Sequence, residues 1–259
     1  MNIFAGSLLL AACIGAGVWI KLHGSFRPGN GPAYDPKQVH PDPASPLRGK
    51  TIFCLGSSVT AGMAARGVSF VDYMAKIDGC TMIEEAVAAS TLADRGPRSY
   101  LRRLRRHPAT KHPIDCFLCQ LSTNDATFRS SIGQISDSFD PADFDVKTTV
   151  GGMEAIIAFA EKTWNCPVVF YTGTRYDNPR YHKLVNLLLE LQEKWGIEVI
   201  DLWHDEEMSR VSAEDYKLYM NDGVHPTKAG YLLWWTPAIQ KQLYKIFTRG
   251  GDAAPAQTP

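Results

Sequence analysis

The fold is decided by a helix that leads directly into a strand, PRYHKLVNLLLELQEKWGIEVIDL at residues 179–202. Four leucines in it recur at the spacing of one helix face: Leu184, Leu187, Leu188 and Leu191. This spacing predicts a helix over Pro179–Trp195, which Gly196 ends, and the apolar, β-branched residues that follow predict a strand over Glu198–Leu202.

The same alternation of strand and helix occupies most of the chain. The other predicted strands are Thr51–Leu55, Thr81–Ala86, Asp115–Leu121 and Pro167–Thr172. The other predicted helices are Val68–Ile77, Pro97–Arg106, Val150–Thr163 and Pro226–Phe247. Strands separated by helices pair in parallel, so we predict an α/β fold: a three-layer α/β/α sandwich with a mostly parallel five-stranded sheet of the flavodoxin-like kind. Functional residues are then expected where the strands end, at the carboxyl edge of the sheet.

Charge and cysteine content exclude several classes of function. The 27 Lys and Arg residues balance the 27 Asp and Glu residues, so no overall basic field recruits nucleic acid. The basic run Arg102–Arg106 is expected on a solvated helix face. Cys116 and Cys119 have C-x-x-C spacing but lie in a predicted strand, where alternation puts them on opposite faces. We therefore expect no metal or redox site there.

The N-terminus carries an apolar run, Ile3–Ile20, about long enough to cross a bilayer. We predict a membrane anchor within residues 1–23; the alternatives are a cleaved signal peptide and a lipoprotein signal ending at Cys13. Lys21 and Arg27 after the run favour a cytoplasmic domain. N-terminal apolar segments usually serve export, however, so we predict an extracytoplasmic domain, with secretion as the alternative.

Composition divides the remainder into three parts. Residues 24–49 are rich in Pro and Gly and predict a tether with little regular structure. Residues 50–248 form the folded domain, and residues 249–259 are predicted to be a disordered tail.

Three short segments follow predicted strands or open the last helix. Gly56-Ser57-Ser58-Val59-Thr60-Ala61-Gly62 is a small, hydroxyl-rich turn that can present a Ser hydroxyl, although Ser is also a common helix cap. In Ser122-Thr123-Asn124-Asp125, the Asn can aim an amide N–H at a developing oxyanion or can satisfy its own turn. In Asp222-Gly223-Val224-His225, the carboxylate can hold one imidazole nitrogen and leave the other to accept a proton.

The three segments, in this order, resemble the sequence blocks of the SGNH/GDSL hydrolases, and the likeness spans about residues 50–245. The resemblance implies Ser58 as nucleophile, His225 as base and Asp222 as the residue that orients it. It further implies an oxyanion hole formed by the N–H of Ser58, the N–H of Ala89 and the side chain of Asn124. Ser57 stands where the family usually has Asp, and Ala89 and Ser122 stand where it usually has Gly.

The expected reaction is hydrolysis of a carboxylic ester through an acyl-enzyme, with no metal or cofactor. Small-molecule, glycan and lipid esters all suit the resemblance; an O-acetyl group on a carbohydrate is one candidate. The loop at residues 173–178 is expected to line the substrate pocket with Arg175 and Tyr176, whereas Trp234 and Trp235 are expected in the core. The three substitutions leave one alternative: a non-catalytic domain that keeps the fold and binds a glycan or lipid.

Overall fold

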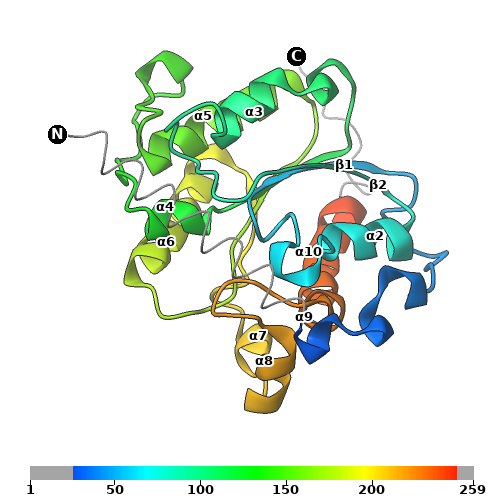
Figure 1. Cartoon of the computed structure of the whole chain (residues 1–259). Coiled ribbons are helices and arrows are strands. Elements are labelled where there is room, and N and C mark those ends of the chain that lie inside the picture. The colour runs from blue at the N-terminus through cyan, green and yellow to red at the C-terminus, as the bar shows by residue number, and fades with distance from the viewer. Residues whose placement is uncertain (1–25, 250–259) are drawn as a thin grey trace.

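A computed structural model describes residues 26–249 and contains one five-stranded, fully parallel sheet (Figure 1). The strands are β1 (Thr51–Gly56), β2 (Thr81–Ala86), β3 (Cys116–Gln120), β4 (Val168–Tyr171) and β5 (Glu198–Ile200). They lie in the order β2-β1-β3-β4-β5. The predicted α/β/α sandwich and its five strands are confirmed, with strand ends within two residues of those expected.

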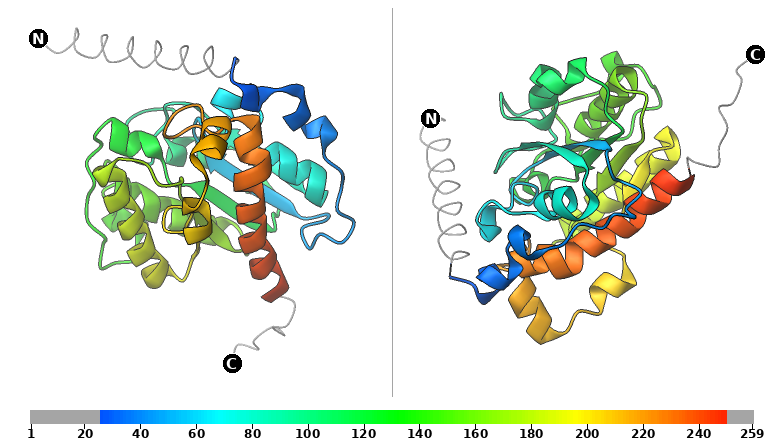
Figure 2. Two further views of the ribbon diagram at one scale, coloured as in Figure 1. Left: turned by 90° about the horizontal axis from the view of Figure 1, so that it is seen from below. Right: turned by 90° about the vertical axis from the view of Figure 1, so that its right-hand side faces the viewer.

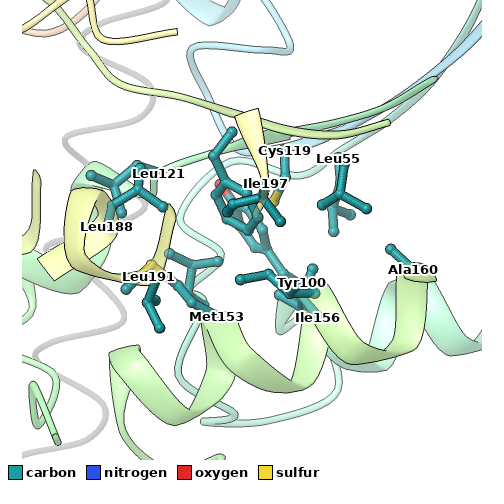
Figure 3. Close-up of a cluster of buried hydrophobic side chains, with 14 of the residues drawn as sticks. Leu55, Tyr100, Cys119, Leu121, Met153, Ile156, Ala160, Leu188, Leu191 and Ile197 are labelled. Atoms are coloured by element: carbon teal, nitrogen blue, oxygen red, sulfur yellow. The ribbon is translucent and has the colours of Figure 1, made fainter. Parts of the chain in front are cut away.

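Helices cover both faces of the sheet. On one face lie α3 (Tyr100–Arg106), α5 (Thr149–Thr163) and α6 (Pro179–Trp195), whose apolar sides enclose a cluster drawn in Figure 3. On the other face lie α2 (Phe70–Asp78) and α10 (Thr236–Arg249). The four leucines that predicted α6 lie in or against the first cluster, so burial of this apolar face stabilises the helix, as the leucine spacing predicted.

The shorter helices connect these layers. The α-helical ones are α4 (Thr123–Thr127), α7 (Glu206–Ser209), α8 (Ala213–Tyr219) and α9 (Lys228–Gly230). Single 3₁₀ turns are η1 (Pro28–Asn30), η2 (Pro32–Tyr34), η3 (Pro36–Gln38), η4 (Met63–Ala65), η5 (Pro108–Lys111) and η6 (Pro141–Asp143). The predicted last helix is present as α9, a π-helical turn η7 (Tyr231–Trp235) and α10 in direct succession.

The two cysteines of the C-x-x-C pair point to opposite faces of β3, as predicted. Cys119 packs among the residues under α3, α5 and α6, and Cys116 packs in the cluster under α2 and α10. Burial raises the pKa of both thiols well above the usual range. Neither side chain is poised for metal or redox chemistry.

The strand order creates a switch point. The chain leaves β1 to form β2 on one side and then returns past β1 to form β3 on the other. At such a point the connections after adjacent strands diverge and leave a crevice at the carboxyl edge of the sheet. The turn after β1 carries Ser58, and α4 after β3 carries Asn124.

Residues 26–49 differ from the tether that their composition predicted. They form η1, η2 and η3, and both views of Figure 2 place this blue segment beside the orange turn that precedes α10. Leu47 is fully buried, and the Ser45 hydroxyl donates to Asp78 Oδ1 at 2.7 Å. Proline fixes φ at the start of each 3₁₀ turn, so the segment loses little backbone entropy when it packs on the domain.

The basic run also differs at one position. Arg105 and Arg106 are exposed as expected, but Arg103 is buried. Its guanidinium donates to the Gly56 carbonyl at the end of β1 and to the Glu85 carbonyl in β2, each at 2.8 Å. Because α3 lies over the ends of two strands, Arg103 can donate hydrogen bonds to backbone carbonyls there. A run of basic residues in the sequence does not reveal this contact.

The predicted anchor at Ile3–Ile20 and the tail from residue 250 lie outside the described residues. Among residues 26–249, no helix has both the length and the apolar character that crossing a bilayer requires.

Candidate active site

The turn that carries Ser58 is held by a buried glutamine. Gln120, the last residue of β3, accepts hydrogen bonds at Oε1 from the Ser57 N–H (2.9 Å), the Thr60 hydroxyl (2.8 Å) and the Ser57 hydroxyl (3.2 Å). A Cβ at Gly56 would lie 1.7 Å from the Thr60 hydroxyl, so the tight exit from β1 requires glycine there. Ser58 is thereby fixed at the carboxyl edge of the sheet.

Asp222 and His225 lie in a compact turn. The Asn221 N–H donates to the His225 carbonyl at 2.9 Å and closes the turn. Asp222 Oδ1 accepts the N–H groups of Val224 (2.8 Å) and His225 (2.9 Å). This is an Asx-type turn, in which the side chain of Asp organises the backbone that follows it.

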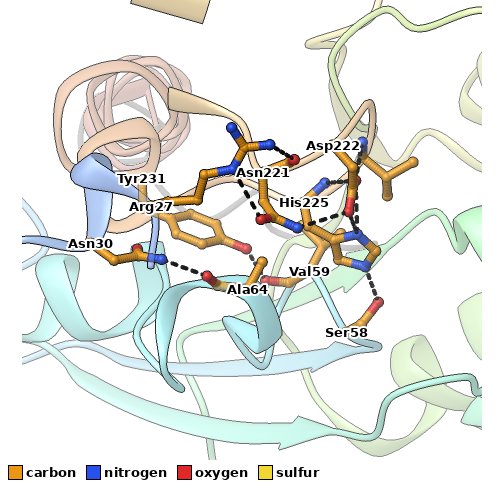
Figure 4. Close-up of polar contacts among 10 residues, drawn as sticks. Arg27, Asn30, Ser58, Val59, Ala64, Asn221, Asp222, His225 and Tyr231 are labelled. Carbon is orange, nitrogen blue, oxygen red and sulfur yellow. Dashed lines mark hydrogen bonds and ion pairs between the residues drawn. The ribbon is translucent and has the colours of Figure 1, made fainter. Parts of the chain in front are cut away.

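The turn brings the imidazole of His225 to Ser58 (Figure 4). His225 Nε2 lies 2.9 Å from Ser58 Oγ, and His225 Nδ1 lies 3.0 Å from each carboxylate oxygen of Asp222. Burial of Asp222 acts to raise its pKa, but the hydrogen bonds and charge of His225 and two backbone N–H groups outweigh it and lower the pKa to about 2. Asp222 is therefore ionised at neutral pH and orients the Nδ1 proton of the imidazole, which leaves Nε2 able to accept the Ser58 proton.

The remaining two predicted residues lie on neighbouring loops. The Ser90 carbonyl accepts from Asn124 Nδ2 at 2.9 Å and from the Ser122 hydroxyl at 3.2 Å, which ties the loop after β2 to the start of α4. One of the two Nδ2 hydrogens of Asn124 is used in this contact, so the other remains for a ligand. Ala89 has a left-handed backbone with φ of 59°, the conformation that the glycine usual at this place adopts readily. Within residues 26–249, the N–H groups of Ser58 and Ala89 donate to no protein acceptor.

Two residues that the sequence analysis did not select hold these loops. Asp125, fully buried, accepts the N–H groups of Leu92 (2.8 Å) and Ala93 (3.0 Å). Arg103 donates to the Ser90 hydroxyl at 3.2 Å, in addition to its contacts with the strand ends. The signals available in the sequence were weak: an acidic residue beside Asn124, and one arginine within a basic run.

Arg175 and Tyr176 have different surroundings. Arg175 lines a hollow of about 300 Å³ together with Thr174, Tyr216 and Trp234. Tyr176 instead packs against the rings of Tyr181 and Trp203, with centroids 5.4 and 5.5 Å away. Trp235 is buried in the core as predicted; Trp234 is half-buried, packs against the same core cluster, and also borders the hollow and stacks on Tyr219.

A second Asp–His pair has the same spacing but no serine. Asp201 Oδ2 lies 2.7 Å from His204 Nδ1, and His204 Nε2 faces His182 Nε2 at 3.4 Å. Spacing alone therefore does not identify a base; the serine contact distinguishes His225. In the part of the chain that the structure describes, no three His, Cys, Asp or Glu side chains gather at metal-binding separation.

Solved structures with the same architecture cover most of the chain. A Lactobacillus plantarum protein superposes with a TM-score of 0.63 at 19% identity, covering 78% of this chain and 98% of its own. A structure described as a GDSL-like lipase from Bacteroides ovatus has a TM-score of 0.55 at 15% identity (78% and 99% covered). An inhibitor-bound aryl esterase of M. smegmatis has a TM-score of 0.52 at 19% identity (76% and 99% covered). At these identities the likeness shows the fold.

None of the curated proteins compared with the chain is significantly similar to it. The sequence profile of the GDSL-like Lipase/Acylhydrolase family, in contrast, matches residues 54–233, which include Ser58, Ala89, Asn124, Asp222 and His225. The chain belongs to this family and is an ester-hydrolysing serine hydrolase.

Proposed function

We propose that Ser58 is the nucleophile of this hydrolase and that Asp222 and His225 activate it. The observation that carries the proposal is the 2.9 Å contact between Ser58 Oγ and a His225 ring whose other nitrogen faces the Asp222 carboxylate. His225 Nε2 takes the Ser58 proton while Ser58 Oγ bonds to the ester carbonyl carbon. The tetrahedral intermediate then expels the alcohol, which receives the proton from His225, and water hydrolyses the acyl-enzyme with His225 again as base.

The oxyanion of the intermediate is held by three donors in this proposal: the N–H of Ser58, the N–H of Ala89 and Nδ2 of Asn124. Two observations support this. Both backbone N–H groups lack a protein acceptor within residues 26–249, and Asn124 Nδ2 has a second hydrogen that its bond to the Ser90 carbonyl does not use. Loss of one such donor typically costs about 3 kcal/mol in the transition state. The methyl group of Ala89 does not remove the N–H, so the substitution for glycine is compatible with the role.

The substrate class that we propose is an O-acylated carbohydrate. The support is the hollow beside the loop after β4, where the rings of Tyr216 and Trp234 and the polar groups of Arg175 and Thr174 lie beside apolar side chains of Leu202, Met208 and Val211. A sugar ring combines an apolar face with hydroxyl groups at its rim, which matches this lining. The loop that carries Thr174 and Arg175 also reaches the turn of Asp222 and His225, since Tyr176 in this loop lies against Gly223.

We further propose that residues 1–23 anchor the enzyme in a membrane with the domain on the extracytoplasmic side. Arg27 lies seven positions after Ile20, the end of the apolar run, and a fully extended chain of that length spans at most about 24 Å. An anchored enzyme would therefore act on esters close to the membrane surface.

The test compares wild type with Ser58→Ala on p-nitrophenyl acetate, on esters of longer acyl chains and on acetylated sugars. Ser58→Ala is expected to abolish turnover while the melting temperature is kept, and a fluorophosphonate probe should label wild type alone. Ser57→Ala is the matched control, since Ser57 faces Gln120 and not His225, and its activity should change little. A wild-type protein that is folded, unlabelled and inactive on every ester would favour the non-catalytic binding domain instead.

A further inference from the structure

The segment at residues 26–38, which we call the strap, packs against the turn that holds Asp222 and His225. We propose that Arg27 in the strap is a positioning residue for the catalytic carboxylate and that it acts through Asn221. This inference rests on the proposed roles of Asp222 and His225. It joins residues 194 positions apart in the sequence.

Arg27 holds both oxygen atoms of Asn221 (Figure 4). Its Nη2 donates to the Asn221 backbone carbonyl at 2.7 Å, and its Nε donates to the side-chain oxygen Oδ1 at 3.4 Å. Because the cation occupies the oxygen end of the amide, the Nδ2 end points to Asp222, where it donates to Oδ2 at 3.2 Å. The guanidinium therefore sets which way the Asn221 amide faces.

The two oxygens of Asp222 are held differently. Oδ1 is fixed by the N–H groups of Val224 and His225, which belong to the same turn. Both oxygens lie 3.0 Å from His225 Nδ1, but only Oδ2 accepts from Asn221 Nδ2. Among the described residues, Asn221 is the one group besides His225 that bonds to Oδ2. Asn221 is 3% exposed and is held by Arg27, so this pair helps to fix the rotation of the carboxylate against the imidazole. A residue that does not touch the substrate can thus orient a catalytic side chain through a hydrogen bond.

Contacts other than those of Arg27 bind the strap to the domain, so the backbone that carries the guanidinium has a fixed position. Asn30 donates to the Ala64 carbonyl at 2.7 Å and accepts the Lys228 N–H at 2.8 Å. The Lys228 ammonium pairs with Asp35 at 3.0 Å. A Cβ at Gly29 would lie 2.1 Å from the Leu218 carbonyl, so the strap approaches the domain as closely as backbone allows. These contacts hold the strap if Arg27 is replaced.

The experiment uses the full-length protein with Arg27→Ala, Arg27→Lys and Asp35→Asn. Arg27→Ala is expected to lower kcat about tenfold with KM within about twofold, since a displaced catalytic group slows the chemical step more than binding. The pH profile of kcat/KM should also change, because the substitution both loosens the carboxylate and removes a positive charge close to the Asp222–His225 pair. Arg27→Lys keeps one donor and should fall between. Asp35→Asn removes a strap contact that does not reach Asn221 and should keep wild-type kcat and pH profile.

A second readout does not depend on activity. The Nδ1 proton of His225, shared with Asp222, is followed by NMR in wild type and in Arg27→Ala, and its downfield resonance should broaden or move in the variant. If wild type proves inactive on esters while this change occurs, the positioning role of Arg27 stands and the proposed function fails. If Arg27→Ala keeps kcat, pH profile and resonance, or loses activity only in proportion to unfolded protein, the inference is overturned.

Discussion

Replacing Asp222 by Asn tests whether the carboxylate works by fixing the tautomer of His225. The Asn side chain keeps one oxygen, which can still accept the N–H groups of Val224 and His225 that Asp222 Oδ1 accepts now. The turn should therefore persist. The other atom becomes an NH₂ group, which would donate to His225 Nδ1 and force the ring proton onto Nε2, the nitrogen that faces Ser58. A protonated Nε2 cannot accept the serine proton.

The expected loss in kcat is about 10⁴-fold, the size of the loss that this exchange causes in a Ser–His–Asp triad. The loss of stability has a different scale. Lowering the pKa of Asp222 from its ordinary value of 3.8 to about 2 corresponds to about 2.5 kcal/mol in favour of the charged form, and the substitution should cost stability of this order at neutral pH.

This stability contribution has a defined pH dependence. Because folding lowers the pKa of Asp222, its contribution is fully present above about pH 4 and is lost as the pH falls through about 2. The difference in melting temperature between wild type and Asp222→Asn should accordingly narrow over that interval, although kcat differs by orders of magnitude at pH 7.

The assay is kcat/KM on p-nitrophenyl acetate together with the rate of fluorophosphonate labelling, and Asp201→Asn is the matched control. Asp201 lies three residues before His204, as Asp222 lies three residues before His225, but its histidine faces His182 and no serine. Asp201→Asn should leave activity unchanged. Activity of Asp222→Asn within tenfold of wild type would refute the tautomer argument, as would an equal loss in Asp201→Asn.

Three further substitutions address the oxyanion donors and their support. Asn124→Ala should lower kcat by about 10²- to 10³-fold with little change in KM, measured on the same ester; a purely raised KM would contradict the role. Ala89→Gly keeps the N–H and relieves the left-handed φ, so activity should stay within about twofold and the melting temperature should rise by about 2–4 °C in a thermal scan. Asp125→Asn sets an NH₂ group against the N–H of Leu92 or Ala93 and should cost about 1–3 kcal/mol in denaturant unfolding, whereas an unchanged midpoint would show that the loops are held by other contacts.

The fold could be predicted because its signals are local. The strands and α6 follow from apolar periodicity, and the parallel pairing follows from their alternation. The Asp222–His225 pair could be predicted for the same reason, since its members lie three positions apart. The contact between Ser58 and His225 spans 167 positions, and its prediction depended on the likeness of three segments to one family rather than on any local pattern.

The residues that hold the site could not be predicted in this way. Gln120, Arg103 and Asp125 each bond to backbone or hydroxyl groups of loops distant in sequence. Periodicity states which face of an element is apolar, but it does not state which carbonyl a buried polar side chain will satisfy. The basic run around Arg103 is typical of a solvated helix. Arg103 is buried because the helix lies over the ends of β1 and β2.

The strap shows why composition misled at the N-terminal side of the domain. Pro and Gly predict a tether with little regular structure, yet here they favour docking: proline restricts the unfolded chain, and Gly29 permits contact where a side chain would clash. A domain boundary placed at residue 50 from composition alone would remove Arg27 and with it the contact to Asn221. A truncated protein of that kind would keep Ser58, Asp222 and His225 in its sequence and, on the argument above, would lose part of their alignment. Low activity of such a truncated protein would then result from the missing strap and would not show that a catalytic triad is absent.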